Sequence, residues 1–203
     1  MKSHIALIDH GVGNLRSVEK ALAVVGANVS LTRDPDVIVA ADKLVLPGVG
    51  AFGDCMNGLR ESGTLELVRS LALERPFLGI CVGMQMLFET SDEMGSHSGL
   101  GLLPGSVTRF KDSDIRIPHT GWNQLEITIE HPLLEGVYTG SYAYFNHSYF
   151  CTPTNLSDVL SYTEYGARFC SIIGRDRLYG IQCHPEKSQD IGLQILRNFV
   201  EKG

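Results

Sequence analysis

The sequence lacks the features that mark membrane, secreted and nucleic-acid-binding proteins. No apolar run in its 203 residues approaches the ~20 residues that a membrane-spanning helix needs, and the first residues show no signal-peptide pattern. Positive charge is scarce, since 17 lysines and arginines stand against 23 aspartates and glutamates. The resulting net charge of −6 gives no reason to expect a nucleic acid or an anionic membrane as a partner. We therefore expect a cytoplasmic protein.

Cysteine is sparse and follows no pattern. The five cysteines are odd in number, and no two are spaced as Cys-x-x-Cys, which argues against both a disulfide framework and a zinc site. The chain also lacks internal repeats, low-complexity tracts and linker-like segments. With 43% hydrophobic residues it can bury a full core. We expect one domain over residues 1–203, with reduced cysteines, no metal and no cofactor.

The stretch around Cys81 has the pattern of a strand-to-helix elbow that carries a nucleophile. An apolar run over residues 77–80 indicates a buried strand, which stops at Cys81 between Gly79 and Gly83. Glycines suit such a turn because the backbones approach too closely for a Cβ atom. Apolar residues at helical spacing then predict a helix that ends near residues 91–92. The sulfur would lie at a helix N-terminus, where the dipole favours the thiolate; a core cysteine between packing glycines is the alternative.

A second apolar strand ends in His184, and Glu186 follows two residues later. A cysteine nucleophile needs a base within hydrogen-bond reach and a carboxylate that orients the base. Two strand ends at one edge of a sheet can supply all three groups. Taken separately, His184 fits a structural histidine and Glu186 a solvated loop charge. Together with Cys81 on an elbow, they indicate a catalytic set.

Strands that alternate with helices in the first half predict an α/β fold. This alternation is typical of a doubly wound, mostly parallel central sheet with right-handed crossovers and helices on both faces. In such sheets the site lies at the carboxyl ends of the strands. The expected strands cover residues 4–9, 28–31 and 43–46, and the expected helices cover residues 15–26, 35–41, 54–62 and 64–74.

After residue 91 the sequence changes to short β-like pieces, which we expect to form a smaller mixed or antiparallel extension of the sheet. A polar loop over residues 95–105 precedes them, and a helix over residues 190–202 follows. Trp122 falls in an expected loop, where an exposed tryptophan is a common anchor for a partner. The expected strands cover residues 106–110, 123–130, 142–150, 159–162 and 170–175.

The segment Pro47-Gly48-Val49-Gly50 follows an expected strand and precedes a helix. A loop of this kind can turn backbone N–H groups toward a developing oxyanion, and its glycines allow both close approach and a peptide flip. The alternative is an ordinary glycine-rich connection without a catalytic role. A Gly-x-Gly pair earlier in the chain lacks the third glycine of a dinucleotide-binding fingerprint, so that kind of site is set aside.

The elbow around Cys81 and the segment His184-Pro185-Glu186 resemble the class I glutamine amidotransferases, which use a Cys-His-Glu triad. Three more particular segments resemble one family within that class, the glutaminase subunits of imidazole glycerol phosphate synthases. The likeness covers essentially the whole chain and implies a flavodoxin-like amidotransferase fold. The three segments are Leu46-Pro47-Gly48-Val49-Gly50-Ala51-Phe52, Pro118-His119-x-Gly121-Trp122-Asn123 and His184-Pro185-Glu186-Lys187-Ser188.

The resemblance implies a reaction. Cys81 attacks the side-chain amide carbon of glutamine, His184 acts as base and then as acid, and Glu186 orients His184. Water then cleaves the thioester to give glutamate. The ammonia passes to a cyclase subunit with a (β/α)8 barrel, in a heterodimer that forms imidazole glycerol phosphate and an aminoimidazole carboxamide ribotide in histidine biosynthesis.

The resemblance also assigns roles to further positions. The oxyanion would be held by the N–H of Val82 and by a donor from the loop Gly48, Val49 and Gly50. The glutamine substrate would be held by Gln85, Glu89, His147, Ser148 and Tyr149. The partner cyclase would face Asn14, Trp122, Tyr144 and Lys187.

Three positions depart from the pattern of this family. His10 replaces a usual tyrosine, Thr120 a usual apolar residue and Asn146 a valine-like residue. They lie near the substrate and partner side, so they bear on the identity of the partner more than on the chemistry. A paralogous subunit that supplies ammonia to a sugar-aminating partner in surface-polysaccharide synthesis is one alternative.

Two further alternatives come from other functional classes. A cysteine hydrolase on the same fold could use Cys81 with His184, but Glu186 directly after His-Pro and Gln85 on the elbow helix argue against it. A catalytically silent assembly partner is the other, and the intact set of Cys81, His184 and Glu186 argues against that interpretation.

Overall fold

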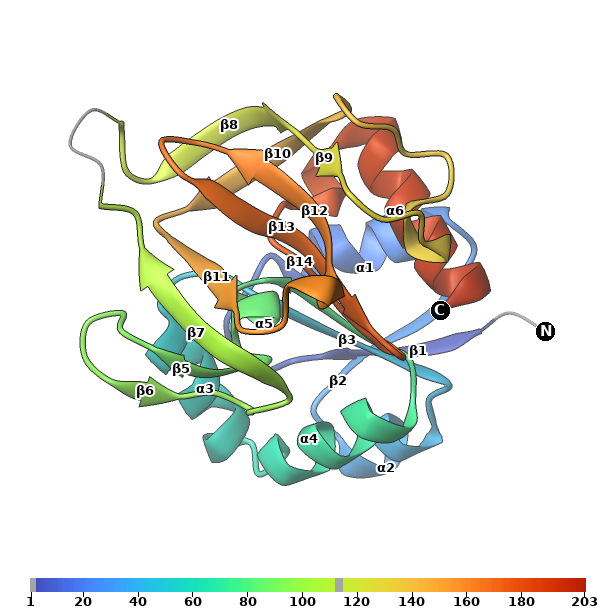
Figure 1. The fold of residues 1–203 in the computed structure, drawn as a ribbon. Coiled ribbons are helices and arrows are strands. Elements are labelled where there is room, and N and C mark those ends of the chain that lie inside the picture. The colour runs from blue at the N-terminus through green and yellow to red at the C-terminus, as the bar shows by residue number, and fades with distance from the viewer. Residues whose placement is uncertain (1–2, 112–114) are drawn as a thin grey trace.

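A computed structural model describes residues 3–111 and 115–203 of the chain. Strands and helices alternate through its first half and give way to a mainly β second half (Figure 1). The first half comprises β1 (His4–Ile8), α1 (Leu15–Val24), β2 (Asn28–Thr32), α2 (Pro35–Ala40), β3 (Lys43–Gly48), α3 (Phe52–Glu61), α4 (Leu65–Glu74), β4 (Phe77–Cys81) and α5 (Val82–Gln85).

In the residues that the structure describes, the second half is built from short strands, three 3-10 helices and one long helix. It comprises β5 (Phe88–Ser91), β6 (His97–Ser98), β7 (Leu103–Arg109), β8 (His119–Gln124), β9 (Glu126–Ile127), η1 (Pro132–Leu134), β10 (Tyr142–His147), β11 (Tyr149–Pro153), η2 (Leu156–Asp158), β12 (Val159–Glu164), β13 (Arg168–Arg175), β14 (Leu178–Ile181), η3 (Pro185–Lys187) and α6 (Gln189–Lys202).

Five neighbouring strands, in the order β2-β1-β3-β4-β14, form the parallel part of the main sheet. Helices α1 and α6 cover one face of these strands, and α2, α3 and α4 cover the other (Figure 1). Strands β3 and β4 are buried along their whole length, as expected for parallel strands that are covered on both faces. The predicted doubly wound α/β fold is confirmed.

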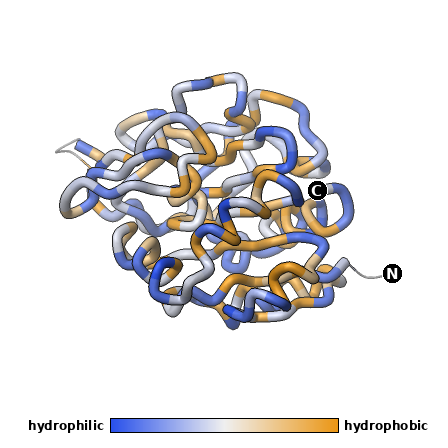
Figure 2. The backbone as a smooth tube through the Cα atoms, turned by 90° about the horizontal axis from the view of Figure 1, so that it is seen from below, coloured by the Kyte–Doolittle hydropathy of each residue, from blue (hydrophilic) through white to orange (hydrophobic). Residues whose placement is uncertain are grey.

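The covering helices are amphipathic, and this explains why they lie on the sheet. Polar and apolar residues alternate along the helices on the side seen in Figure 2. Helix α1 buries Val18, Ala21 and Leu22, whose spacing puts them on one helical face. Helix α2 starts where the Asp34 side chain accepts a hydrogen bond from the backbone N–H of Asp36, a standard N-cap. No helix in the described ranges is long and apolar enough to cross a membrane.

The main sheet continues beyond β14 with strands of mixed direction. Strand β13 runs antiparallel to β14, β11 antiparallel to β13, and β7 antiparallel to β11, before β5 and β6 close the edge. Strands β8 and β10 pair with each other in a separate two-stranded sheet. The predicted smaller extension is therefore present, although several of its elements differ from those expected.

The helix after the elbow is much shorter than predicted. Helix α5 ends at Gln85, and residues 88–91 form strand β5 instead of further helical turns. The reason lies in later segments: Leu100 N–H donates to the Met86 carbonyl at 2.8 Å, and β5 pairs with β7 and β6. The expected polar loop over 95–105 accordingly contains β6 and the start of β7.

Two other expectations about the second half are wrong. Trp122 lies on strand β8, not in a loop, because residues 119–124 pair with β10. The expected strand over 142–150 is two strands, β10 and β11, which separate at Ser148. Strand β10 joins the small sheet and β11 joins the main one, so this break lets the chain pass between the two sheets.

A buried lysine ties the first half of the chain to its last helix. The Lys43 ammonium donates to the carbonyl oxygens of Phe199 at 2.8 Å, Val200 at 3.0 Å and Gly203 at 2.7 Å. These oxygens lie at the C-terminal end of α6, where the helix dipole favours a cation. The Phe199 oxygen also accepts a hydrogen bond from the Gly203 N–H at 3.1 Å.

Replacing Lys43 by methionine should therefore destabilise the fold. The substitution keeps the apolar stem but leaves these carbonyls without a charged donor, which should lower the free energy of unfolding by about 1.5–3 kcal/mol. Urea denaturation measures the loss. Lys20→Met on the exposed side of α1 is the matched control and should change stability by less than about 0.5 kcal/mol. Equal effects of the two substitutions would contradict this role of Lys43.

Candidate active site

The carboxyl ends of three adjacent parallel strands meet at one place. Strand β4 lies between β3 and β14, with Gly48 opposite Cys81 and Ile181 opposite Ile80. The glycine loop, the elbow cysteine and the segment that carries His184 thus leave the sheet side by side. This is the edge at which ligands bind in open α/β sheets.

Cys81 sits in a strained turn that glycines make possible. Its backbone has φ 56° and ψ −113°, a conformation that a residue with a side chain rarely adopts. A Cβ atom at Gly83 would lie 1.8 Å from the Leu46 carbonyl oxygen, and one at Gly79 would lie 2.5 Å from the Gly83 carbonyl oxygen. The flanking glycines of the elbow motif are therefore required by backbone contacts.

His184 is oriented by a buried carboxylate. Its Nδ1 lies 2.9 Å from Glu186 Oε1, and both side chains are almost fully buried. Because the carboxylate can only accept, Nδ1 carries the proton and Nε2 is left for Cys81. The second carboxylate oxygen, Oε2, has no hydrogen-bond partner among the described residues, which concentrates the interaction of this carboxylate on the imidazole.

The electrostatics of the pair favour a charged imidazole. Burial alone would lower the pKa of His184, but hydrogen bonds with the Cys81 side chain and with Glu186 raise this pKa to about 10. The protonated ring is the form that these partners stabilise. Cys81, His184 and Glu186 are thus brought together in the spatial order that a nucleophile, its base and an orienting carboxylate would need.

The other four cysteines have no comparable surroundings. Each is buried, and burial raises the pKa of its thiol above the ordinary value, to about 12 for Cys55 and for Cys183. A thiol in that state is a poor nucleophile. Within the described residues, only Cys81 combines an elbow with a base.

Two side chains hold the glycine loop next to the elbow. His10 Nε2 donates to the Pro47 carbonyl at 2.6 Å, and the Cys55 thiol donates to the Val49 carbonyl at 3.3 Å. Gly50 has φ +78°, in the region that favours glycine. The loop therefore passes close to Val82 and Gly83, with Gly48 too near them to carry a side chain.

The sequence belongs to a large known family. A family model described as glutamine amidotransferase class-I matches residues 6–202. The imidazole glycerol phosphate synthase subunit HisH of Syntrophotalea carbinolica is 47% identical over 202 residues, covering 96% of this chain and 98% of the relative. The HisH subunit of Salinibacter ruber is 50% identical over 202 residues, covering 96% of this chain and 92% of the relative.

The chain belongs to the class I glutamine amidotransferases. Its resemblance to the glutaminase subunits of imidazole glycerol phosphate synthases, inferred above from short motifs, is confirmed by these relatives. Solved structures agree on the fold. A structure described as a glutamine amidotransferase superposes with a TM-score of 0.73 at 20% identity, covering 93% of this chain and 94% of its own. One titled PurLQS from Thermotoga maritima superposes with a TM-score of 0.76 at 17% identity, covering 98% of each.

The residues expected to hold substrate occupy different environments in this amidotransferase. Gln85 is buried beside the triad, and its Nε2 donates to the Tyr149 carbonyl at 3.0 Å. His147 is also buried, with Nε2 3.2 Å from His119 Nδ1 and Nδ1 2.8 Å from the Tyr149 carbonyl. Burial lowers the pKa of His147 to about 3, so its ring is neutral. Ser148 lies at the break between β10 and β11, half-buried.

Glu89 differs from the other substrate positions because it is exposed. It lies on β5, and its carboxylate accepts a hydrogen bond from the Gly105 backbone N–H at 2.9 Å. The carboxylate is therefore anchored to the start of β7 and is not part of the buried network around Gln85.

Three of the four positions expected to face a partner form one surface cluster. Trp122 is 46% exposed and meets the Tyr144 ring edge-on, with ring centroids 6.0 Å apart. The Lys187 ammonium lies over the Tyr144 ring, 5.6 Å from its centroid. The Tyr144 and His184 rings are 6.5 Å apart, so the cluster adjoins the triad. Asn14, the fourth position, lies at the start of α1, which packs against η3.

Two of the departures from the family pattern form a single interaction. Thr120 and Asn146 are directly opposite each other on β8 and β10, and the Thr120 hydroxyl donates to Asn146 Oδ1 at 3.0 Å. The third departure, His10, makes the contact with Pro47 described above. Spacing along the chain carries no information about such cross-strand pairs.

Sequence reasoning missed two residues of the site. Gln182 lies directly after β14, and its Nε2 is 3.7 Å from Cys81 Sγ. The Ser188 hydroxyl donates to the His184 carbonyl at 2.6 Å and accepts from the Tyr144 N–H at 2.9 Å. The available signal was the position of Gln182, two residues before His184 at the end of the strand expected beside the elbow.

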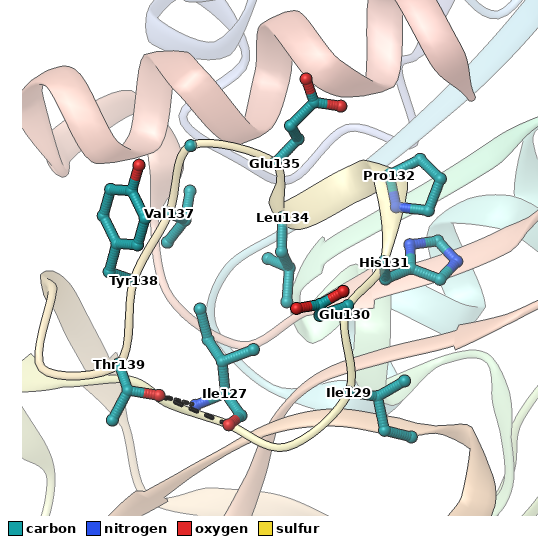
Figure 3. A pocket seen from close by; sticks show the side chains of 11 residues that line it. Ile127, Ile129, Glu130, His131, Pro132, Leu134, Glu135, Val137, Tyr138 and Thr139 are labelled. Carbon is teal, nitrogen blue, oxygen red and sulfur yellow. Dashed lines mark hydrogen bonds between the residues drawn. The ribbon is translucent and has the colours of Figure 1, made fainter.

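A hollow elsewhere on the chain is unrelated to this chemistry. It measures about 530 Å³ and is lined by Ile127, Leu134, Val137 and their neighbours around η1 (Figure 3). No member of the triad lines it. In residues 3–111 and 115–203, no group of three or more His, Cys, Asp or Glu side chains is placed to hold a metal ion.

The raised pKa of His184 should depend on both of its partners. Cys81→Ala and Glu186→Gln each remove a group that stabilises the imidazolium, while burial, which favours the neutral ring, remains. The pKa of His184 should therefore fall in both variants, measured by NMR titration of its ring protons. Cys55→Ser is the control and should leave it near 10. A pKa of about 10 in all three variants would show that neither partner sets it.

Proposed function

We propose that Cys81, His184 and Glu186 hydrolyse glutamine in the cytoplasm, and that the chain, a single catalytic domain, delivers the ammonia to a cyclase subunit. The observation that carries the proposal is the imidazole of His184 between the Cys81 sulfur and the buried Glu186 carboxylate. Both relatives named above are subunits of imidazole glycerol phosphate synthase, which favours this partner over a sugar-aminating one.

Glutamine would bind with its side-chain amide over Cys81. The two N–H directions of Gln85 are used by Tyr149 and Gln182, which leaves Gln85 Oε1 to accept from the substrate's α-ammonium group. Glu89 at the exposed edge would add a negative charge for the same group. His147 would act indirectly, by holding the Tyr149 carbonyl, and Ser148 would meet the substrate through its backbone.

The first half of the reaction forms a thioester. The Cys81 thiolate attacks the amide carbon, and the carbonyl oxygen becomes an oxyanion. The N–H of Val82 at the start of α5 and a donor from the loop Gly48 to Gly50 would hold this charge. His184 then gives its Nε2 proton to the leaving nitrogen, the C–N bond breaks, and ammonia departs.

The second half returns the enzyme to its starting state. Neutral His184 takes a proton from water, and the hydroxide attacks the thioester carbon. The C–S bond breaks, glutamate leaves, and the proton stays on His184 beside the Cys81 thiolate. Throughout, Glu186 keeps Nδ1 protonated and the ring in place.

The partner would dock on the cluster of Trp122, Tyr144 and Lys187, beside the triad. Cys81 is only 2% exposed, so glutamine and ammonia must pass through a site that is nearly closed in the isolated chain. A partner with a (β/α)8 barrel would receive ammonia there, shielded from protonation by water. Docking beside the glycine loop would also select one peptide orientation, and an oxyanion hole without one donor loses roughly 100- to 1000-fold in rate.

Cys81→Ala should separate the two reactions. The variant complex should lose glutamine-dependent synthesis entirely, because no thioester can form, but should keep synthesis from added ammonium salt, which the partner performs. Both rates are measured on the purified complex with the cyclase substrate. Loss of both reactions with the complex intact would instead make Cys81 a structural residue.

Trp122→Ala should weaken the complex. Truncating an exposed tryptophan at the centre of an interface costs about 2 kcal/mol or more, so affinity for the cyclase should fall roughly 30-fold. Isothermal titration measures this change. Leu156→Ala, at a position 65% exposed on η2, is the control and should bind like the parent chain. Unchanged affinity of the Trp122 variant would place the partner on another face.

A further inference from the structure

Gln182 contacts both the Cys81 sulfur and Gln85, one of the residues proposed to hold the substrate. It directly follows β14, whose register with β4 places it opposite Cys81, and its side chain is 0% exposed. Its Nε2 lies 3.7 Å from Cys81 Sγ, and its Oε1 lies 3.1 Å from Gln85 Nε2. The backbone N–H donates to the Ser171 carbonyl at 2.8 Å, which fixes the base of the side chain.

The orientation of this amide follows from its surroundings. The Tyr149 carbonyl can only accept, so the atom of Gln85 that faces it, at 3.0 Å, must be the nitrogen. The same nitrogen faces Gln182, which must therefore present its oxygen to Gln85. Gln182 then has its N–H groups on the side of Cys81. Turning either amide over would set donor against donor or acceptor against acceptor.

The Tyr149 carbonyl is itself held in place by a second donor. His147 Nδ1 lies 2.8 Å from it, and His147 Nε2 faces His119 Nδ1 at 3.2 Å. Burial lowers the pKa of both rings, to about 3 and about 4, so each is neutral with one donor and one acceptor nitrogen. The antiparallel extension thereby fixes the carbonyl that orients Gln85, and through it Gln182.

We infer that Gln182 is a further catalytic residue, whose amide N–H donates to the Cys81 sulfur and stabilises it as a thiolate. This inference rests on the proposed function, in which Cys81 is the nucleophile. A hydrogen bond to an ionised acceptor is roughly twice as strong as one to a neutral acceptor, so the contact favours the charged sulfur. That charge appears twice in the cycle, once before attack on glutamine and again when the thioester C–S bond breaks.

The test compares Gln182→Met with the parent chain, both in complex with the cyclase. Methionine has a similar volume and fills cores adaptably, but it cannot donate. Iodoacetamide alkylation of Cys81 at neutral pH should slow about tenfold, and should return to the parent rate at high pH, where the sulfur is ionised in both proteins. The glutaminase kcat should fall by a similar factor, with KM for glutamine within about twofold.

Gln182→Glu is a second variant, which keeps the inference testable if the methionine variant fails to fold. It keeps the size and the oxygen that faces Gln85 but sets a carboxylate against the sulfur, so it should slow alkylation at neutral pH by more than about tenfold. Asn198→Leu is the control for losing a buried amide, because Asn198 bonds the Leu133 and Glu135 carbonyls on another side of the fold. Asn198→Leu should lower the free energy of unfolding and leave the alkylation rate of Cys81 and the glutaminase kcat unchanged.

Two results would contradict the role of Gln182 and leave the proposed roles of Cys81, His184 and Glu186 unaffected. Parent-like alkylation and kcat in both Gln182 variants would show that the contact does not affect the sulfur. An equal slowing at neutral and high pH would show that Gln182 only shapes the site. Failure of the proposed function looks different: Cys81→Ala would then keep glutaminase activity, whatever the Gln182 variants do.

Discussion

The site depends on the close contact between the backbones of β3, β4 and α5 at the elbow. Gly83 lies so near the end of β3 that a Cβ atom would be 1.8 Å from the Leu46 carbonyl oxygen. This contact presses α5 against the sheet and holds Cys81 at φ 56°, at a cost of about 1–3 kcal/mol that the buried strands around it offset. In this position the sulfur lies next to the side chains of Gln182 and His184.

The same fold creates two opposite environments for buried histidines. His184 faces a carboxylate and a sulfur, and its pKa rises to about 10. His147 faces the Tyr149 carbonyl and His119 faces His147 and the Asn123 amide. Burial lowers the pKa values of His119 and His147 to about 4 and about 3. One histidine can therefore transfer protons, while the other two serve as fixed hydrogen-bonding groups. Burial is common to all three, so the neighbouring groups decide which role each takes.

The sequence predicted the parts of the site that depend on local patterns. The glycines around Cys81 and the short step from His184 to Glu186 are such patterns, because one turn or one dipeptide determines them. Elements that depend on distant pairing were wrong. The helical spacing of Val82, Met86 and Leu87 predicts a helix that continues to residues 91–92, but residues 88–91 form a strand because β7 and β6 lie beside them. Trp122 looks like a loop residue beside Gly121 and becomes part of β8 through its pairing with β10. Gln182 was missed because its importance comes from a neighbour about a hundred residues away in the chain, at 3.7 Å in space.

The covalent intermediate provides the most direct test of the central claim, that the elbow sulfur carries out the chemistry. The complex with the cyclase is mixed with glutamine, quenched in acid within the first turnovers, digested and examined by mass spectrometry. A glutamyl group should be found on the peptide that contains Cys81 and on none of the peptides with Cys55, Cys151, Cys170 or Cys183. It should disappear as glutamine is used up. Glutamate production without any adduct on Cys81, or an adduct on another cysteine, would contradict the account.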